Sequence, residues 1–225
     1  MIRLKNVTKT YRRPDGAVTS ALSVDELLVA AGESLCVVGG SGTGKTTLLN
    51  VLAGIVLPDQ GDVVVDGEDV VRMSEARRDA YRARKIGYVF QTFNLLQAYT
   101  AEENVLLPLM FAGKKRSESR LRAAELLARV GLGDKRDRKP SELSVGEQQR
   151  VAIARASACR PKVLLADEPT ANLDPQNAVA AMKLLREVAA EAGAVLLVVT
   201  HDQRLKDEFA RVETLIAPVR KGAAS

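Results

Sequence analysis

The sequence predicts an α/β fold with a mostly parallel sheet, an antiparallel β portion near the N-terminus and an inserted helical subdomain. Three continuous apolar runs are typical of strands that helices cover on both faces of a parallel sheet. These runs are SLCVV at 34–38, KVLLA at 162–166 and AVLLVV at 194–199. Residues 2–7 and 62–67 alternate between apolar and polar side chains, as antiparallel strands do. Between residues 92 and 160 the pattern is helical.

These segments fit one domain, because a chain of 225 residues can bury one substantial core with a modest inserted subdomain. We expect residues 1–91 and 161–225 to form the α/β core, with GYVF at 87–90 as a further strand. We expect residues 92–160 to form the helical subdomain.

One helix of the subdomain has recognisable ends. Ser117 is a residue type that caps helix N-termini, and Gly131 is the type that follows helix C-termini. Spacing predicts one apolar face between these ends. Its members are Leu121, Ala124, Leu127 and Ala128.

The composition, with 46% hydrophobic and 27% charged residues, is that of a soluble globular protein. No apolar run approaches the roughly 20 residues that a membrane helix needs. The N-terminus lacks the apolar core of a signal peptide, so the cytoplasm is the expected compartment. Cys36 and Cys159 lie among small or apolar neighbours, and we expect both to be reduced thiols.

The net charge of +5 comes from basic clusters at 77–85, 114–122 and 134–139. Such clusters are either solvated surface or a surface near anionic lipid. Nucleic acid is not an expected partner, because aromatic residues make up only 4% of the chain and do not interleave with the clusters.

A glycine-rich segment, GGSGTGKTT at 39–47, follows the first apolar run and opens a helix that ends at Gly54. It fits the pattern G-x-x-x-x-G-K-S/T, in which successive backbone N–H groups and the helix N-terminus surround an anion. Lys45 reaches the outer phosphates and Thr46 offers a hydroxyl to Mg²⁺. The segment therefore predicts a nucleoside triphosphate site. Its members are Gly39, Gly40, Ser41, Gly42, Thr43, Gly44, Lys45, Thr46 and Thr47.

Two carboxylates follow the second apolar run. Asp167 is expected to hold the Mg²⁺ shell opposite the glycine-rich loop, and Glu168 to polarise the attacking water as a general base. The alternative is a turn at the end of a strand that carries two solvated acids.

His201, the only histidine of the chain, follows the third apolar run. A lone histidine is usually a surface or satisfied core residue. The carboxyl end of a parallel strand, however, is where ligands of such sheets collect. We therefore expect His201 to donate a hydrogen bond to the terminal phosphate.

A second helix start lies in PSELSVGEQQRVAIARA at 140–156. Ser144 occupies the expected N-cap, Gly146 leaves the backbone open to a ligand, and an apolar-periodic helix follows. The chain therefore has two helix starts suited to phosphate.

In this order, the motifs resemble the nucleotide-binding subunit of an ATP-binding-cassette (ABC) transporter over nearly the whole chain. The glycine-rich loop alone would also fit kinases and small GTPases, which the second helix start excludes. The resemblance implies ATP and Mg²⁺ as ligands and a homodimer, packed head to tail, that forms on ATP binding. Ser144 and the Gly146 backbone would then bind the terminal phosphate of the partner's ATP, with Glu147 nearby.

The resemblance also assigns three further residues. Gln91 would bind Mg²⁺ and link the site to the helical subdomain, although by itself it is an ordinary polar residue at a strand end. Asp174, in the segment ANLD, would lie where the two subunits touch. Tyr11 would stack on adenine, the alternative being a packing role at a turn.

Val145 departs from the family pattern, which has glycine at this position. A β-branched side chain does not take a positive φ cheaply. If the position is helical or extended, Val145 only adds bulk; if it needs a glycine conformation, phosphate affinity falls. We favour the first interpretation.

The segment FQTFNLLQAYTAEENVLLPLMF at 90–111 most resembles ATPases of the lipoprotein-release and macrolide-exporter group. That group implies an integral membrane permease as partner and a peripheral location on the cytoplasmic face of the inner membrane. The apolar stretch from 104 to 113 would form the groove that receives the partner, or would only pack the subdomain. The same ATPase acting in cell division or signalling, without solute transport, is the alternative function.

Overall fold

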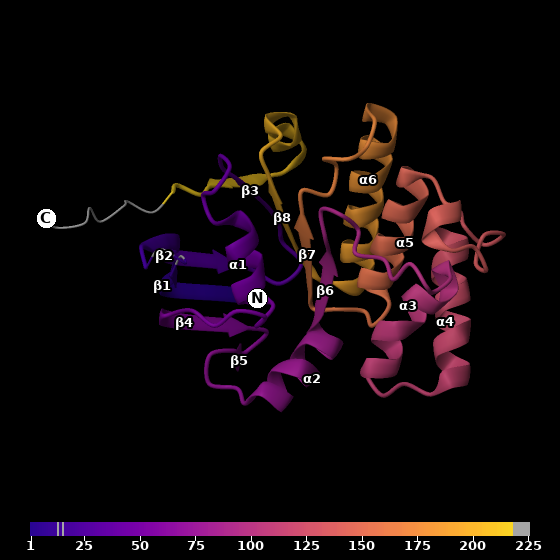
Figure 1. Cartoon of the computed structure of the whole chain (residues 1–225), viewed down its shortest axis with the longest axis horizontal. Coiled ribbons are helices and arrows are strands. Elements are labelled where there is room, and N and C mark those ends of the chain that lie inside the picture. Colours follow the sequence, from indigo (N-terminus) through magenta and orange to yellow (C-terminus); the bar gives the residue numbers. More distant parts are fainter. Residues whose placement is uncertain (13, 15, 218–225) are drawn as a thin grey trace, which may run out of the picture.

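The protein, described here from a computed structural model, has an α/β architecture with two sheets and helices beside and between them (Figure 1). The structure describes residues 1–12, 14 and 16–217, without the side chains of residues 203 and 204. One sheet is antiparallel and the other is parallel, so the predicted fold class is confirmed.

The antiparallel sheet has the strand order β2-β1-β4-β5. Its strands are β1 (Ile2–Arg12), β2 (Val18–Val29), β4 (Gln60–Val65) and β5 (Glu68–Asp69). Alternation along β1 buries Ile2 and Leu4, as the apolar–polar pattern predicts. The alternation breaks at Asn6, which has a φ of +51°, and Val7 is buried in its place. β2 pairs with β1 along nearly its whole length, although its sequence shows no clear alternation.

The parallel sheet has the strand order β6-β7-β8-β3-β9. Its strands are β3 (Ser34–Val38), β6 (Ile86–Val89), β7 (Val163–Asp167), β8 (Val195–Thr200) and β9 (Arg211–Thr214). Every residue of β7 and β8 is buried, which explains why these strands read as continuous apolar runs. Because β3, β7 and β8 are parallel, their carboxyl ends meet at one edge of the sheet.

Helices cover both faces of the parallel sheet. α1 (Lys45–Leu52) lies between the two sheets, where Leu48 and Leu49 share a core with Leu4 and Leu165. α6 (Pro175–Ala192) packs on the other face, burying Met182 and Leu185 among the side chains of β7 and β8.

The basic cluster at 77–85 lies on α2 (Glu75–Lys85), a helix that the charge pattern alone does not reveal. Ser74 caps this helix, and Tyr81 is its only buried residue. Part of the cluster is paired, since Arg82 contacts Asp79 and Lys85 contacts Asp66.

Helices α3 (Ala101–Phe111), α4 (Arg116–Arg129) and α5 (Val145–Ser157), with the short 3₁₀ turn η1 (Pro140–Glu142), follow β6 and precede β7. They lie side by side at one end of the molecule (Figure 1) and share a core of their own. The division of the chain at residues 92 and 160 stays a prediction.

The predicted start of α4 is wrong, and of its predicted apolar face only Leu127 is buried. The helix begins at Arg116 with Lys115 as N-cap, so Ser117 lies inside its first turn. Its core face holds Ser119, Ala123, Leu126 and Leu127, whereas Leu121 is 68% exposed. A serine can occupy this face because its hydroxyl donates to the Lys115 carbonyl at 2.9 Å, which offsets the cost of burial. The predicted end at Gly131 agrees with the structure, in which Val130 is the C-cap.

No described helix is long and apolar enough to cross a bilayer. Both cysteines are free, with Cys36 buried and Cys159 partly buried.

We expect Gly87→Ala to destabilise the protein, because β6 and α5 touch at this position. An added Cβ would lie 2.2 Å from the Ala156 carbonyl oxygen and 2.8 Å from a methyl carbon of Leu164. Forcing the two elements apart should lower the free energy of unfolding by about 1–3 kcal/mol, measured by urea denaturation. Gly133→Ala is the matched control, since its Cβ would lie 3.4 Å from the nearest atom. Equal stability of the two variants would contradict the close-packing explanation.

Candidate nucleotide site

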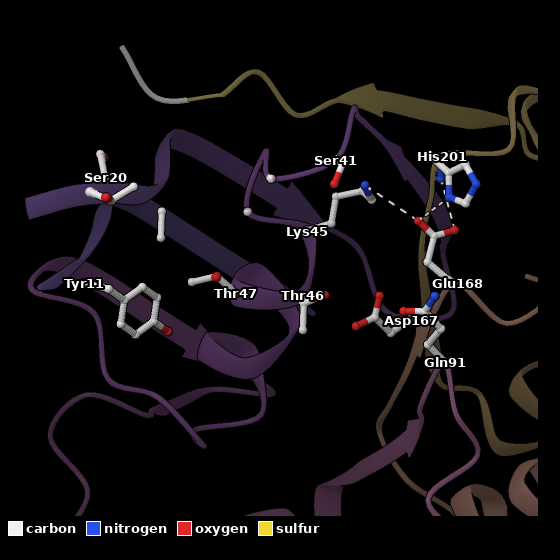
Figure 2. A pocket seen from close by; sticks show the side chains of 14 residues that line it. Tyr11, Ser20, Ser41, Lys45, Thr46, Thr47, Gln91, Asp167, Glu168 and His201 are labelled. Carbon is white, nitrogen blue, oxygen red and sulfur yellow. Dashed lines mark hydrogen bonds and ion pairs between the residues drawn. The ribbon is translucent and has the colours of Figure 1, made fainter. Parts of the chain in front are cut away.

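A pocket of about 610 Å³ lies between the antiparallel sheet and the carboxyl ends of the parallel strands (Figure 2). Tyr11 and Ser20 stand on one side, Asp167 and Glu168 on the other, with Lys45 between them. The lining residues are Tyr11, Thr19, Ser20, Ala21, Ser41, Gly42, Gly44, Lys45, Thr46, Thr47, Gln91, Asp167, Glu168 and His201. Of the predicted loop residues, Gly39, Gly40 and Thr43 do not line the pocket.

The loop between β3 and α1 requires glycine for steric reasons. Gly44 has a φ of +97°, and a Cβ there would lie 2.0 Å from the carbonyl oxygen of Ala21. No side chain caps α1, and its first turn contains no acidic residue. The amides at the start of α1 are therefore free of side-chain acceptors and suited to an anion.

Lys45, the first residue of α1, folds back over this loop. Its Nζ donates to the carbonyl oxygens of Gly39 at 2.9 Å and Gly40 at 3.0 Å. The same nitrogen lies 3.6 Å from Oε1 of Glu168, and both side chains are almost fully buried. The loop thus holds one buried positive charge directly opposite the carboxylates.

Asp167 ends β7 and is buried beside the loop. Burial raises the pKa of its carboxyl group, and the neighbouring negative charge of Glu168 acts in the same direction. A hydrogen bond with Thr46 and the charge of Lys45 oppose that rise in pKa. A nearby cation would stabilise the ionised form of a carboxyl group in such surroundings.

The oxygen donors of Asp167, Thr46 and Gln91 line the same pocket, and they form a donor set that suits Mg²⁺. Among the described residues, no group of three or more His, Cys, Asp or Glu side chains could hold a metal by itself.

Glu168 lies directly beyond β7, with a left-handed φ of +45° that non-glycine residues seldom adopt. Its backbone N–H donates to the carbonyl of Val199 at 2.9 Å. One carboxylate oxygen, Oε2, accepts hydrogen bonds from Thr200 Oγ1 at 2.8 Å and from the His201 N–H at 3.1 Å. The buried carboxylate is therefore held by the neighbouring strand β8.

The imidazole of His201 lies at the carboxyl end of β8, where its Nδ1 is 2.9 Å from Oε1 of Glu168. Its side chain is 65% exposed and lies beside the pocket (Figure 2). The structure thus brings together Glu168 and His201, which are 33 residues apart in sequence. A contact between His201 and a phosphate stays a prediction.

Four residues at the site are not singled out by the sequence motifs. Thr19, Ser20 and Ala21 reach the pocket because β2 pairs with β1, which places Thr19 opposite Tyr11. Thr200 reaches Glu168 because β8 is the neighbour of β7. These positions depend on strand pairing, and only recognition of β2 as a strand could have indicated the first three.

Ser144, Gly146 and Glu147 lie outside the pocket, at the start of α5. Ser144 is the N-cap, as predicted, and it forms a reciprocal capping box with Glu147. A hydrogen bond from Lys135 and the Ser144 backbone N–H lower the pKa of Glu147 to about 2. A negative charge therefore lies beside the Ser144 hydroxyl, and Lys135 balances it.

Comparison with known proteins identifies the family. The family model described as ABC transporter matches residues 22–171. The chain belongs to the ABC transporter family. It is an ATP-binding and ATP-hydrolysing subunit of that family, as the motifs predicted.

Two similar relatives are lipoprotein-releasing system ATP-binding proteins named LolD. The one from Geobacter metallireducens is 43% identical over 216 residues, which is 96% of each chain. The one from Chromohalobacter salexigens is 44% identical over 215 residues, covering 96% of this chain and 90% of the relative.

Solved structures of the ATP-binding cassette MJ0796 are also similar. A dimeric post-hydrolysis state bound to ADP and Pi has a TM-score of 0.88 at 39% identity, covering 96% of this chain and 95% of that chain. A second dimeric structure of this bacterial ABC transporter cassette has a TM-score of 0.87 at 40% identity, with coverage of 96% and 94%.

Val145, where the ABC pattern has glycine, is the first residue of α5 and is helical. It has no positive φ, and its side chain is 47% exposed. The position therefore needs no glycine conformation, and Val145 adds bulk to the surface. This agrees with the favoured interpretation.

Gly146 has a packing role that the sequence does not reveal. A Cβ there would lie 2.6 Å from Oδ1 of Asn177 in α6. Asn177 is itself held by Asp174, the N-cap of α6, whose carboxylate accepts from the Asn177 side chain at 2.6 Å. The absence of a side chain at Gly146 therefore lets α5 pack against the start of α6, and Asp174 caps its own helix.

We expect Gly146→Ala to lower the free energy of unfolding by up to about 1 kcal/mol, because the new methyl group displaces the end of the Asn177 side chain and breaks its hydrogen bond to Asp174. Asn177→Ala in the same chain should restore part of that loss by vacating the space. Urea denaturation of both single variants and the double variant gives the coupling between the two positions. Strictly additive effects would show that the methyl group does not meet Asn177.

Proposed function

We propose that this ABC ATPase works as a head-to-tail homodimer that drives a membrane partner of the lipoprotein-releasing or exporter type. The observation that carries the proposal is an identity of 43–44% to two LolD proteins over 96% of the chain. With such a partner, the subunit would lie peripherally on the cytoplasmic face of the inner membrane.

ATP binding is assigned to the pocket between the two sheets. The loop amides and Lys45 would hold the phosphates, and exposed Tyr11 would stack on adenine at the far side of the pocket. Thr46, Asp167 and Gln91 would hold Mg²⁺, which neutralises phosphate charge when bound. The buried ammonium of Lys45 supports this assignment, because it donates to the loop carbonyls and lies 3.6 Å from the Glu168 carboxylate at the edge of the same pocket.

Hydrolysis is assigned to Glu168 as general base. Its carboxylate would take a proton from water while the water oxygen bonds to the terminal phosphorus and the bond to the bridging oxygen of ADP breaks. His201, 2.9 Å from the same carboxylate, would donate to the terminal phosphate.

Dimerisation would complete the site. Ser144 and the Gly146 backbone lie outside their own pocket, so a nucleotide that they contact would belong to a second subunit. Glu147 would lie nearby, and the segment around Asp174 would meet the partner subunit. The dimeric state of the similar MJ0796 cassette structures supports this arrangement.

A groove of about 300 Å³ between α2, β6 and α3 is suited to a segment of the membrane partner. Its apolar lining includes Tyr88, Leu96, Leu107 and Phe111, and Phe111 is 78% exposed. The groove includes part of the sequence segment that resembles the lipoprotein-release group. An exposed aromatic residue beside an apolar groove is typical of a protein contact.

A membrane pull-down with tagged Glu168→Gln in Mg-ATP tests the proposal. We expect a partner with few membrane helices and a large extracytoplasmic domain. Capture of a permease with many membrane helices would contradict the lipoprotein-release type. Capture of only division proteins would support the alternative function in cell division.

We expect Lys45→Ala to weaken ATP binding by at least about tenfold, because it removes the charge at the loop. Isothermal titration calorimetry measures the affinity. Lys183→Ala, an exposed lysine of α6 outside the pocket, is the control and should bind ATP normally. Unchanged affinity in Lys45→Ala would refute the phosphate-binding role.

We expect Glu168→Gln to bind ATP and dimerise but to hydrolyse it about 10²–10⁴ times more slowly, because an amide is a poor base. Phosphate release measures turnover, and size-exclusion chromatography in ATP measures dimerisation. Turnover like that of the unaltered protein would exclude Glu168 as the base.

A further inference from the structure

We propose that Thr200 is a positioning residue that orients the carboxylate of Glu168 for proton transfer. The proposal rests on the proposed role of Glu168 as general base. Thr200 does not line the nucleotide pocket, so any effect on hydrolysis would pass through Glu168.

Thr200 is the last residue of β8 and is fully buried, with 0% of its surface exposed. The five residues before it in the strand are valine or leucine, so it is the only polar side chain of β8. Parallel pairing places Asp167 of β7 opposite Val199 of β8. Glu168 follows Asp167, and Thr200 follows Val199. Strand register therefore sets the hydroxyl beside the carboxylate.

The direction of the hydrogen bond follows from the second partner of the hydroxyl. Thr200 Oγ1 accepts from the backbone N–H of Asp202 at 3.0 Å. A hydroxyl has one proton to donate, and the 2.8 Å contact to Oε2 of Glu168 takes it. The turn after β8 thus orients the hydroxyl toward Glu168.

The two oxygens of Glu168 have different surroundings. Oε2 is held by Thr200 and by the His201 backbone N–H. Oε1 faces the side chains of His201 and Lys45, and both contacts are drawn as dashed lines in Figure 2. One oxygen is therefore anchored to β8, and the other is directed toward the pocket as the proton acceptor.

An anchor is needed at this position because the Glu168 backbone has a left-handed φ of +45° and its side chain has several rotatable bonds. Without the hydroxyl, only one donor would remain on Oε2, and the carboxylate could turn to other rotamers. A hydrogen bond to a charged group is strong enough to select one orientation.

The test compares Thr200→Val, Thr200→Ser and Ser119→Ala in steady-state ATP hydrolysis. We expect Thr200→Val to lower kcat by roughly 10- to 100-fold, with the KM for ATP unchanged within about twofold. Thr200→Ser keeps the hydroxyl and should restore most of kcat. Ser119→Ala removes an equally buried hydroxyl in α4, remote from the pocket, and should leave kcat unchanged.

A double-variant comparison separates an effect that passes through Glu168 from a general loss of structure. If Thr200 acts through Glu168, then Thr200→Val added to Glu168→Gln should lower the residual turnover by less than about twofold. The same fall in both backgrounds would overturn the proposal, as would normal kcat in Thr200→Val or failure of Thr200→Ser to restore it. If Thr200→Val does not fold, Thr200→Ala takes its place in each comparison.

Different results would overturn the general-base role of Glu168 and the positioning role of Thr200. Normal turnover in Glu168→Gln would overturn the general-base role itself. Loss of turnover in Glu168→Gln together with normal turnover in Thr200→Val would overturn only the positioning role.

Discussion

The parallel pairing of β8 between β3 and β7 is the constraint on which the site depends. It brings the segment after β3 to the same edge of the sheet as two segments that lie more than a hundred residues later in the sequence. Lys45 follows β3, Glu168 follows β7 and His201 follows β8. No loop contact is needed to bring these groups together, because the strand hydrogen bonds already set their spacing. The chemistry of the pocket is in this sense a consequence of sheet topology.

Much of the fold and of the site could be predicted from the sequence. Buried parallel strands are recognisable because both of their faces are covered, and the loop before α1 is recognisable because its conformation demands glycine. β2 and α2 could not be recognised: one has no regular alternation, and the other buries a single residue of a highly charged helix. The orientation of α4 could not be predicted either, because a buried serine bonded to its own helix leaves no apolar signature. The contact between Thr200 and Glu168 depends on strand register, which a single sequence does not specify.

The start of α5 is connected to the rest of the chain through two side chains. Asn177 packs against Gly146 and bonds to Asp174. Gln149, fully buried, donates to the carbonyl of Pro169 at 2.8 Å, one residue beyond Glu168. Its amide oxygen has no hydrogen-bond partner among the described residues. The helix that carries Ser144 therefore cannot shift without disturbing α6 or the segment next to the Glu168 carboxylate. The hydrogen bond from Gln149 therefore connects α5 directly to the segment after β7 within one subunit.

His201 also makes the protein favourable for spectroscopy. The chain contains a single histidine, and the fold places it at the carboxylate of Glu168. Its imidazole carbon-bound protons therefore give one pair of NMR resonances in a spectral region without other histidine signals. These resonances need no assignment by mutagenesis, and selective labelling with histidine would mark one position per subunit. The site can thus be followed with and without nucleotide in the unaltered sequence.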